Sequence, residues 1–148
     1  LEDYLKPGQI VFDVGCGSGI LSVAAVKLGA YFVYARDIDP AAVIAARKNG
    51  TLNGITSGFE VEGGRFLDSF YGKAHLILAN IVSDAIIEFS PQAYERLLPG
   101  GIFIVSGIIS ARMSEVREKL EADGFVLLKT EVQDDWVAMA AGKPEGRA

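Results

Sequence analysis

Short runs of β-branched and aromatic residues alternate along the chain with segments whose apolar residues recur at helical spacing. The first pattern predicts strands and the second predicts helices. The predicted strands are Ile10–Val14, Tyr31–Ala35, Phe59–Val61, Leu76–Ala79, Gly101–Ser106, Phe125–Val132 and Trp136–Ala140. The predicted helices are Ile20–Leu28, Pro40–Asn49 and Met113–Asp123, with shorter helical turns at Ser83–Glu88 and Pro91–Leu97.

Local signals mark several of the predicted helix ends. Gly29 follows the first helix and Gly124 follows the last, as glycine often does after a helix C-terminus. Asp39 can accept hydrogen bonds from free N–H groups of the second helix, and Pro40 fits its first turn. Gly50 stands where a helix former is expected, at a cost of about 1 kcal/mol relative to alanine.

The alternation of strands and helices predicts an α/β fold with parallel strands joined by helical crossovers on both faces of a sheet. The end of the chain departs from this pattern. Only Gln133–Asp135 separates the last two strands, whereas a parallel crossover needs about a dozen residues. These strands must form a hairpin, so we predict a doubly wound, seven-stranded, mostly parallel sheet with an antiparallel last strand.

Composition limits the classes of protein that are possible. The chain has 148 residues, of which 50% are hydrophobic and 22% charged, and these values are typical of one globular domain spanning residues 1–148. A net charge of −5 argues against direct nucleic-acid binding through bulk charge. No apolar run is long enough to span a membrane. Cys16 is the single cysteine, so we expect no internal disulfide, no all-cysteine metal site and a reducing, cytoplasmic location.

The candidate chemistry lies where the first two strands end. Residues 13–19 (DVGCGSG) follow the first strand and open the first helix. Glycines there let backbone N–H groups approach a ligand closely. Asp37 ends the second strand, 22 residues after Gly15, where a carboxylate can accept hydrogen bonds from both ribose hydroxyls of a nucleoside.

The spacing of the glycines separates two kinds of nucleoside site. A dinucleotide fingerprint requires a third glycine at position 20, which is isoleucine here, and the third glycine is Gly19. The G-x-G-x-G loop followed by Asp37 resembles the S-adenosylmethionine site of Rossmann-like (class I) methyltransferases. The terminal hairpin resembles the reversed last strand of that fold.

Motifs in the second half resemble one family within this class, the ribosomal protein L11 methyltransferases of the PrmA type. They are LANIVSD at 78–84, LLPGG at 97–101, SGI at 106–108 and WVA at 136–138. The resemblance implies an S-adenosylmethionine-dependent protein N-methyltransferase, with S-adenosylhomocysteine as product and a ribosomal protein as substrate. It also implies an amino-terminal substrate-docking domain, which this sequence lacks, so we interpret the chain as an excised catalytic domain.

The resemblance also assigns roles to particular residues. Gly15, Cys16 and Gly17 would contact the cofactor, with the two glycines against its methionine part. Asp37 would hold the ribose, and Ile38 would lie on the adenine. The residues assigned to the edge of the adenine are Gly64 and Arg65, and Asn80 is placed beside the methyl group.

Asn80 is the predicted catalytic residue. The sulfonium cofactor is already activated, so the hypothesis is direct attack by a neutral amine, with no metal. Neutralising a lysine at pH 7 costs about 4.6 kcal/mol, and an α-amino group about 1.4 kcal/mol. An amide oxygen of Asn80, with the carbonyl of Ile81, can accept hydrogen bonds from the amine without favouring its charged form.

Three other functions remain open at this point. One is a class I methyltransferase for a small molecule or a nucleic-acid base, although the chain lacks the aromatic residue that would stack on a flipped base after Asn80-Ile81. Another is a nicotinamide-dependent oxidoreductase, for which Arg36 beside Asp37 suggests a phosphorylated ribose. The third is a cofactor-binding module that is inactive without its missing domain.

Overall fold

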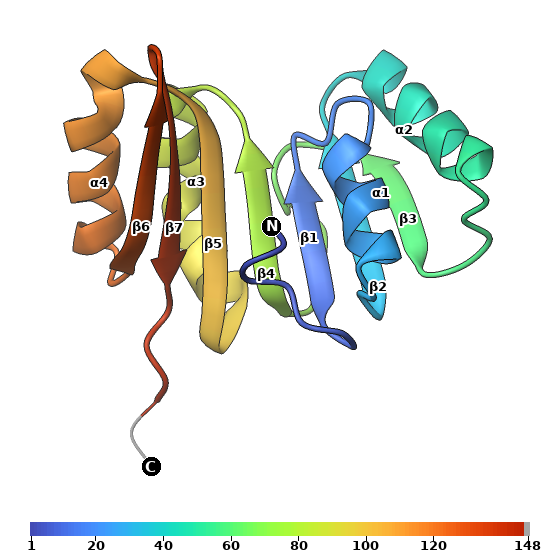
Figure 1. Ribbon diagram of the computed structural model, residues 1–148, viewed down its shortest axis with the longest axis horizontal. Coiled ribbons are helices and arrows are strands. Elements are labelled where there is room, and N and C mark those ends of the chain that lie inside the picture. The colour runs from blue at the N-terminus through green and yellow to red at the C-terminus, as the bar shows by residue number, and fades with distance from the viewer. Residues whose placement is uncertain (147–148) are drawn as a thin grey trace.

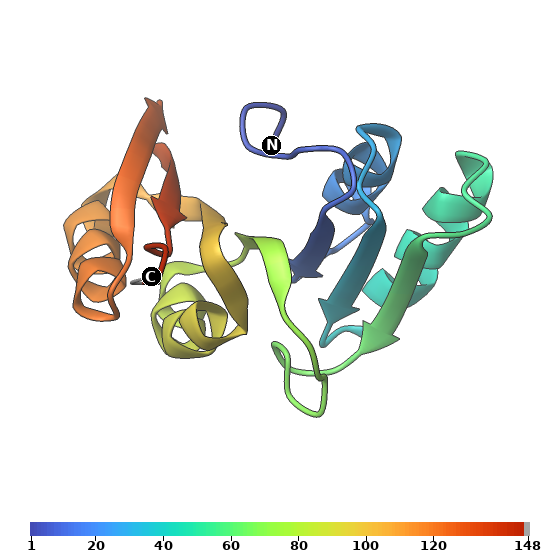
Figure 2. The ribbon, with the colours of Figure 1, turned by 90° about the horizontal axis from the view of Figure 1, so that it is seen from below.

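The computed structural model describes residues 1–146 and has three layers (Figure 1). A central seven-stranded sheet has helices α1 and α2 on one face and α3 and α4 on the other (Figure 2). Along the chain the elements are β1 (Ile10–Val14), α1 (Ile20–Lys27), β2 (Phe32–Asp37), α2 (Pro40–Leu52), β3 (Phe59–Gly63), β4 (Ala74–Asn80), α3 (Ser83–Arg96), β5 (Leu97–Ile109), η1 (Ser110–Arg112), α4 (Met113–Ala122), β6 (Val126–Gln133) and β7 (Trp136–Gly142).

The strand order is β3-β2-β1-β4-β5-β7-β6. The pairs among β3, β2, β1, β4 and β5 are parallel, and β7 is antiparallel to both β5 and β6. The predicted fold class is therefore confirmed, including the hairpin and the reversed last strand. The order changes direction at β1, because β2 and β3 lie on one side of it and β4 on the other. Ligands bind at such a switch point, at the carboxyl ends of the strands.

The core is divided by the sheet. The larger cluster lies between the sheet and helices α3 and α4, and Phe12, Ile77, Phe89 and Phe103 are among its fully buried side chains. Smaller clusters lie under α1 and α2 on the opposite face. Burial on both faces explains why β4 is almost uninterruptedly apolar.

Helix α3 corrects one prediction. Two separate helical turns were expected on either side of position 90, but the structure has one helix from Ser83 to Arg96 with Pro91 inside it. Pro91 is exposed, so its ring lies on the solvent side, while Ile86, Phe89 and Ala93 form a continuous buried face. Packing of this face against the sheet outweighs the loss of one helical hydrogen bond.

Strand β5 also differs from its prediction. It begins at Leu97 rather than Gly101, and its pairing with β4 shifts register between the Ala74–Leu97 and Leu76–Ile102 pairs. Four residues of β5, 98–101, lie between these pairs against one residue of β4, so the irregularity accommodates three extra residues in β5.

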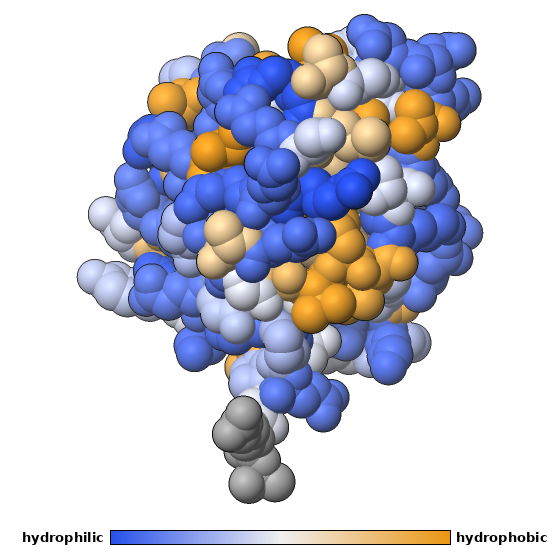
Figure 3. Space-filling view, turned by 90° about the vertical axis from the view of Figure 1, so that its left-hand side faces the viewer, coloured by the Kyte–Doolittle hydropathy of each residue, from blue (hydrophilic) through white to orange (hydrophobic). Residues whose placement is uncertain are grey.

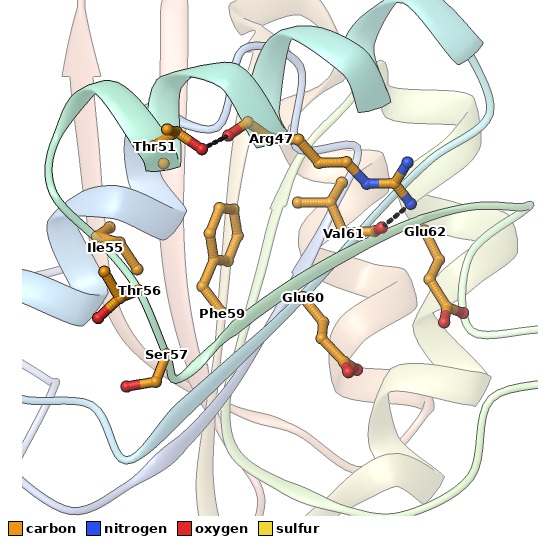
Figure 4. A pocket seen from close by; sticks show the side chains of 10 residues that line it. Arg47, Thr51, Ile55, Thr56, Ser57, Phe59, Glu60, Val61 and Glu62 are labelled. Carbon is orange, nitrogen blue, oxygen red and sulfur yellow. Dashed lines mark hydrogen bonds between the residues drawn. The ribbon is translucent and has the colours of Figure 1, made fainter.

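The two edge strands of the sheet, β3 and β6, differ in what covers them. Apolar Val126, Leu128 and Val132 of β6 stay exposed, and Figure 3, which shows this end of the molecule, has such areas separated by polar surface. At the other end, Arg47 of α2 donates a hydrogen bond to the carbonyl of Val61 in β3 (2.7 Å) across a groove of about 360 Å³ (Figure 4).

In the described residues, no helix is both long and apolar enough to cross a membrane.

Gly50 has a packing role that its position in α2 alone does not reveal. It is buried, and a Cβ there would lie 2.9 Å from a ring carbon of Phe59. The groove in Figure 4 shows the Phe59 ring directly below this turn of the helix. The residue that weakens the helix therefore allows α2 to approach β3.

We predict that Gly50→Ala lowers the free energy of unfolding by about 1 kcal/mol, because the overlap with Phe59 exceeds the gain in helix propensity. Urea denaturation measures this change. Lys48→Ala, at an exposed position of the same helix, is the control and should leave stability nearly unchanged. A more stable Gly50→Ala variant would show that Phe59 moves aside without cost.

Candidate functional site

The pairing of β1 places three predicted site residues at one edge of the sheet. Val14, the last residue of β1, is paired with Arg36 of β2 on one side and with Ala79 of β4 on the other. The next residue in each strand or loop is Gly15, Asp37 or Asn80. Since the strands are parallel, these residues lie at the same level, at the carboxyl ends of the strands.

A cavity of about 540 Å³ opens at this edge. Its size falls within the range of small-molecule sites. It is lined by Val14, Gly15, Gly17, Asp37, Ile38, Gly64, Arg65, Phe66, Asn80, Ile81, Val82, Ala85 and Glu88. Every residue predicted to contact the cofactor is among them except Cys16, which lines an adjoining cavity of about 230 Å³ together with Gly15, Gly17 and Asn80.

Gly15 and Gly17 of the loop are required for two different reasons. Gly15 has a φ of 72°, and a Cβ there would overlap the side chain of Ile81. Gly17 has a φ of 55° with no atom near the Cβ position, so its requirement is conformational. The open space beside Gly17 leaves backbone exposed to the cavity.

Asp37 joins this loop to the end of β2. Its Oδ2 accepts a hydrogen bond from the backbone N–H of Gly17 (2.9 Å), and its Oδ1 accepts one from the N–H of Asp39 (2.9 Å). Each carboxylate oxygen can accept further hydrogen bonds. Backbone donors therefore orient the carboxylate while leaving it able to bind a pair of hydroxyl groups.

Asp13 is a candidate site residue that the sequence reasoning missed. Its side chain is buried within β1, and its Oδ2 accepts a hydrogen bond from the Ser22 hydroxyl (2.6 Å). Its Oδ1 has no hydrogen-bond partner among residues 1–146, and Asp13 lines the smaller cavity. Burial, with a contribution from the charge of Asp37, raises the pKa of Asp13 to about 6. An acid inside an otherwise apolar strand is the signal that identifies it.

Cys16 lies in the glycine loop, where its side chain packs against the small cluster under α2. Burial, together with the negative charges of Asp13 and Asp37, raises the pKa of its thiol to about 12. The thiol is therefore protonated at neutral pH and is a poor nucleophile.

Asn80 lies between the two cavities, because it lines both. It is exposed at the end of β4, and a Cβ on Gly107 would lie 3.0 Å from its Oδ1. Gly107, with a φ of 84°, therefore leaves room for this amide. The position suits hydrogen bonding to a ligand that reaches both cavities.

In the far wall of the larger cavity, the predicted residue Arg65 contacts Phe66 and Glu88, which the sequence analysis did not single out. Arg65 forms an ion pair with Glu88 of α3 and lies over the ring of Phe66, 4.6 Å from its centroid. The hydrogen bond with Glu88 raises the pKa of Arg65. Ala85 and Glu88 are three residues apart in α3 and therefore neighbours on its surface, so assigning Ala85 to the site would have pointed to Glu88.

Arg36, the residue that suggested a phosphorylated ribose, has a structural role. It is buried, donates a hydrogen bond to the carbonyl of Asp68 (2.8 Å) and lies 3.9 Å from a carboxylate oxygen of Glu62. A Cβ on Gly64 would overlap its guanidinium group. These contacts hold Arg36 beneath the cavity wall. The Arg36 side chain is therefore engaged in the fold and no longer indicates a site for the phosphorylated ribose of a nicotinamide cofactor.

The sheet order with its reversed β7, and the glycine loop and acid at the switch point, define a class I, Rossmann-like methyltransferase fold. The sequence model of the family described as ribosomal protein L11 methyltransferase (PrmA) matches residues 1–144. The chain belongs to this family. In residues 1–146, no cluster of His, Cys, Asp or Glu is arranged to hold a metal ion.

Individual relatives agree with the family assignment. Proteins named ribosomal protein L11 methyltransferase from Caldanaerobacter subterraneus and Geobacillus kaustophilus are each 47% identical to this chain over 97% of its length. The chain spans only 46% of each of these relatives. A crystal structure of ribosomal protein L11 methylase from Lactobacillus delbrueckii superimposes with a TM-score of 0.90 and 34% identity, covering 95% of this chain and 72% of that one.

We predict that Asp13 makes stability fall as the pH rises. Its native pKa of about 6 exceeds the ordinary value of 3.8, so the folded chain binds more protons than the unfolded chain between these values. The contribution of Asp13 to the free energy of unfolding is fully present below pH 3.8 and is lost as the pH rises through 6. The total loss is about 3 kcal/mol at most.

Urea denaturation of the parent protein and of Asp13→Asn between pH 4.5 and 7.5 tests this. The stability of the variant relative to the parent should increase over this range, since the amide carries no charge to bury. Asp134→Asn, at an exposed turn, is the control and should follow the parent curve. Parallel curves for Asp13→Asn would show that the Asp13 carboxyl is not perturbed.

Proposed function

We propose that this chain binds S-adenosylmethionine in the cavity at the carboxyl ends of β1, β2 and β4, and transfers its methyl group to amino groups of a large-subunit ribosomal protein. The observation that carries the proposal is the single cavity shared by Gly17, Asp37 and Asn80. The names of the relatives support the substrate class.

The charges of the site fit the chemical groups of this cofactor. Asp37, oriented by two backbone N–H groups, binds the two ribose hydroxyls. The Oδ1 of buried Asp13, which accepts no hydrogen bond from residues 1–146, offers a negative charge to the cofactor's ammonium group through the smaller cavity. Gly15, Cys16 and Gly17 form the wall along the methionine part, and Ile38, Gly64 and Arg65 surround the adenine.

The cofactor supplies an electrophilic methyl group on a sulfonium, so this chain's residues need only align and desolvate the amine. The Asn80 amide oxygen and the Ile81 carbonyl accept hydrogen bonds from the N–H groups of the neutral amine. Their dipoles orient the nitrogen lone pair toward the methyl carbon. They also favour the neutral amine more than a carboxylate would, because they add no full negative charge beside it.

The chain spans about half of its curated relatives, and this bears on how it would engage the ribosomal protein. We propose that residues 1–148 form the catalytic domain, and that in relatives of the family an amino-terminal domain docks the substrate. The cavity and its cofactor residues lie wholly within the chain, so cofactor binding should not require a docking domain.

Asp37→Ala should weaken binding of S-adenosylhomocysteine by at least about 100-fold, because two hydrogen bonds to a charged acceptor, each worth about 1.5 kcal/mol or more, are lost. Isothermal titration calorimetry measures the affinity. Asp39→Ala is the matched control, since Asp39 caps α2 through the N–H of Ala41 and does not line the cavity. It should reduce stability by about 1 kcal/mol and leave the affinity unchanged. Tight binding by Asp37→Ala would contradict the ribose assignment.

Asn80→Ala should retain S-adenosylhomocysteine binding within about threefold, but lower the rate of methyl transfer by about 100-fold, as loss of one positioning dipole does in other enzymes. The assay is transfer of a labelled methyl group to ribosomal protein L11, by the chain alone and joined to the remaining part of the Geobacillus kaustophilus relative. Unchanged turnover would refute the catalytic role of Asn80. Absence of transfer in both parent forms would refute the proposed substrate.

A further inference from the structure

One stripe of helix α3 holds the segment that connects β3 to β4. This segment, residues 64–73, contains no helix, unlike the connections between most other parallel strands in the sheet. Polar side chains at positions i, i+4 and i+8 of α3 contact it. Glu88 pairs with Arg65, Gln92 accepts from the N–H of Leu67 (3.0 Å) and donates to Asp68 (3.2 Å), and Arg96 donates to the carbonyl of Phe70.

The three contacts of this stripe are not equivalent. Gln92 and Arg96 each bind a backbone group of the segment, and Gln92 also binds the Asp68 side chain, whereas, among the described residues, Glu88 binds only the Arg65 side chain. Glu88 and Arg65 also line the larger cavity, and Gln92 and Arg96 do not. The segment is thus secured away from the cavity, and the pair at the cavity adds little stability, since its side chains are 49% and 57% exposed. The Arg65–Glu88 pair is therefore not needed to hold the segment and can contact a ligand in the cavity.

The remaining hydrogen-bonding capacity of this pair faces a mostly apolar wall. The wall includes Ile38, Phe66, Val82 and Ala85. Apart from Asp37, the charged side chains that line the cavity in residues 1–146 are Arg65 and Glu88. Oε1 of Glu88 accepts from Arg65, and in the described chain Oε2 accepts no hydrogen bond. The guanidinium group is held in place by both Glu88 and the Phe66 ring.

Such a wall suits a flat base with a polar edge, and this step rests on the proposed function. With the ribose at Asp37 and the sulfur near Asn80, the base occupies the part of the cavity bounded by Ile38, Phe66 and Ala85. The edge of adenine presents an amine donor at C6 beside an acceptor at N1. A carboxylate complements the first group and a guanidinium the second.

We propose that Glu88, positioned by Arg65, accepts a hydrogen bond from the exocyclic amine of the adenine, and that it makes the site select a 6-aminopurine over a 6-oxopurine. A 6-oxopurine places a carbonyl oxygen where the amine was. The carboxylate of Glu88 repels that oxygen and loses its hydrogen bond. Discrimination therefore comes from an unfavourable contact as well as from a missing one.

Calorimetry with S-adenosylhomocysteine and its deaminated analogue, S-inosylhomocysteine, tests the proposal on the whole chain. The parent protein should bind the amino form at least about tenfold more tightly, as expected for one half-exposed hydrogen bond to a charged group. In Glu88→Gln this ratio should fall to about one, because an amide can accept from an amine or donate to a carbonyl. Glu95→Gln, an exposed change on the same helix, should keep the parent ratio.

The outcomes separate the inference from the proposed function. If Glu88→Gln weakens both ligands equally and keeps the parent ratio, Glu88 only fastens the segment to α3 and the inference is overturned. The inference is also wrong if the parent protein does not discriminate between the ligands while it binds both. If the parent binds neither ligand, the proposed function itself fails.

Discussion

The whole site depends on the register of one central strand. β1 is hydrogen-bonded to β2 and β4 in parallel, and the pairs that Val14 makes with Arg36 and Ala79 bring Gly15, Asp37 and Asn80 to a common level. A shift of one residue in either pairing would turn every side chain of the shifted strand to the opposite face. The buried apolar residues on both faces of β1 and β4 prevent such a shift, so the hydrophobic core also sets the geometry of the cavity.

Two carboxylates, one partly exposed and one buried, lie near the carboxyl ends of the central strands. Asp37 is held by the N–H groups of Gly17 and Asp39, while Asp13 is buried and, within the part of the chain that the structure describes, one of its oxygens has no hydrogen-bond partner. Burial first, and the negative charge of Asp37 to a smaller extent, disfavour the ionised form of Asp13 and raise its pKa. This cost is a substantial fraction of the net stability of a folded domain, and the rest of the core offsets it. A bound cation would relieve it, which links the strain to the proposed cofactor.

Helix α3 shows how packing and site formation are combined. Its buried face, with Ile86, Phe89 and Ala93, contributes to the largest core cluster, and this packing keeps the helix continuous through Pro91. The polar stripe of α3 that flanks this face holds the segment after β3, so that Gly64 and Arg65 become a wall of the cavity. Periodicity alone predicted broken helical turns here, because the effect of a proline depends on whether the remaining face is buried.

The sequence by itself determined most of the elements, though not the continuity of α3 or the start of β5. It also determined the hairpin and the glycine loop with its acid, because these follow from local rules of strand periodicity, loop length and backbone conformation. It did not reveal the roles of Asp13, Arg36, Gly50 or Glu88. Asp13 was identified by burial, Arg36 by its contact with Asp68, Gly50 by the ring of Phe59 and Glu88 by its pairing with Arg65. Each of these roles depends on groups far apart in the chain, and only the tertiary structure decides which distant groups meet.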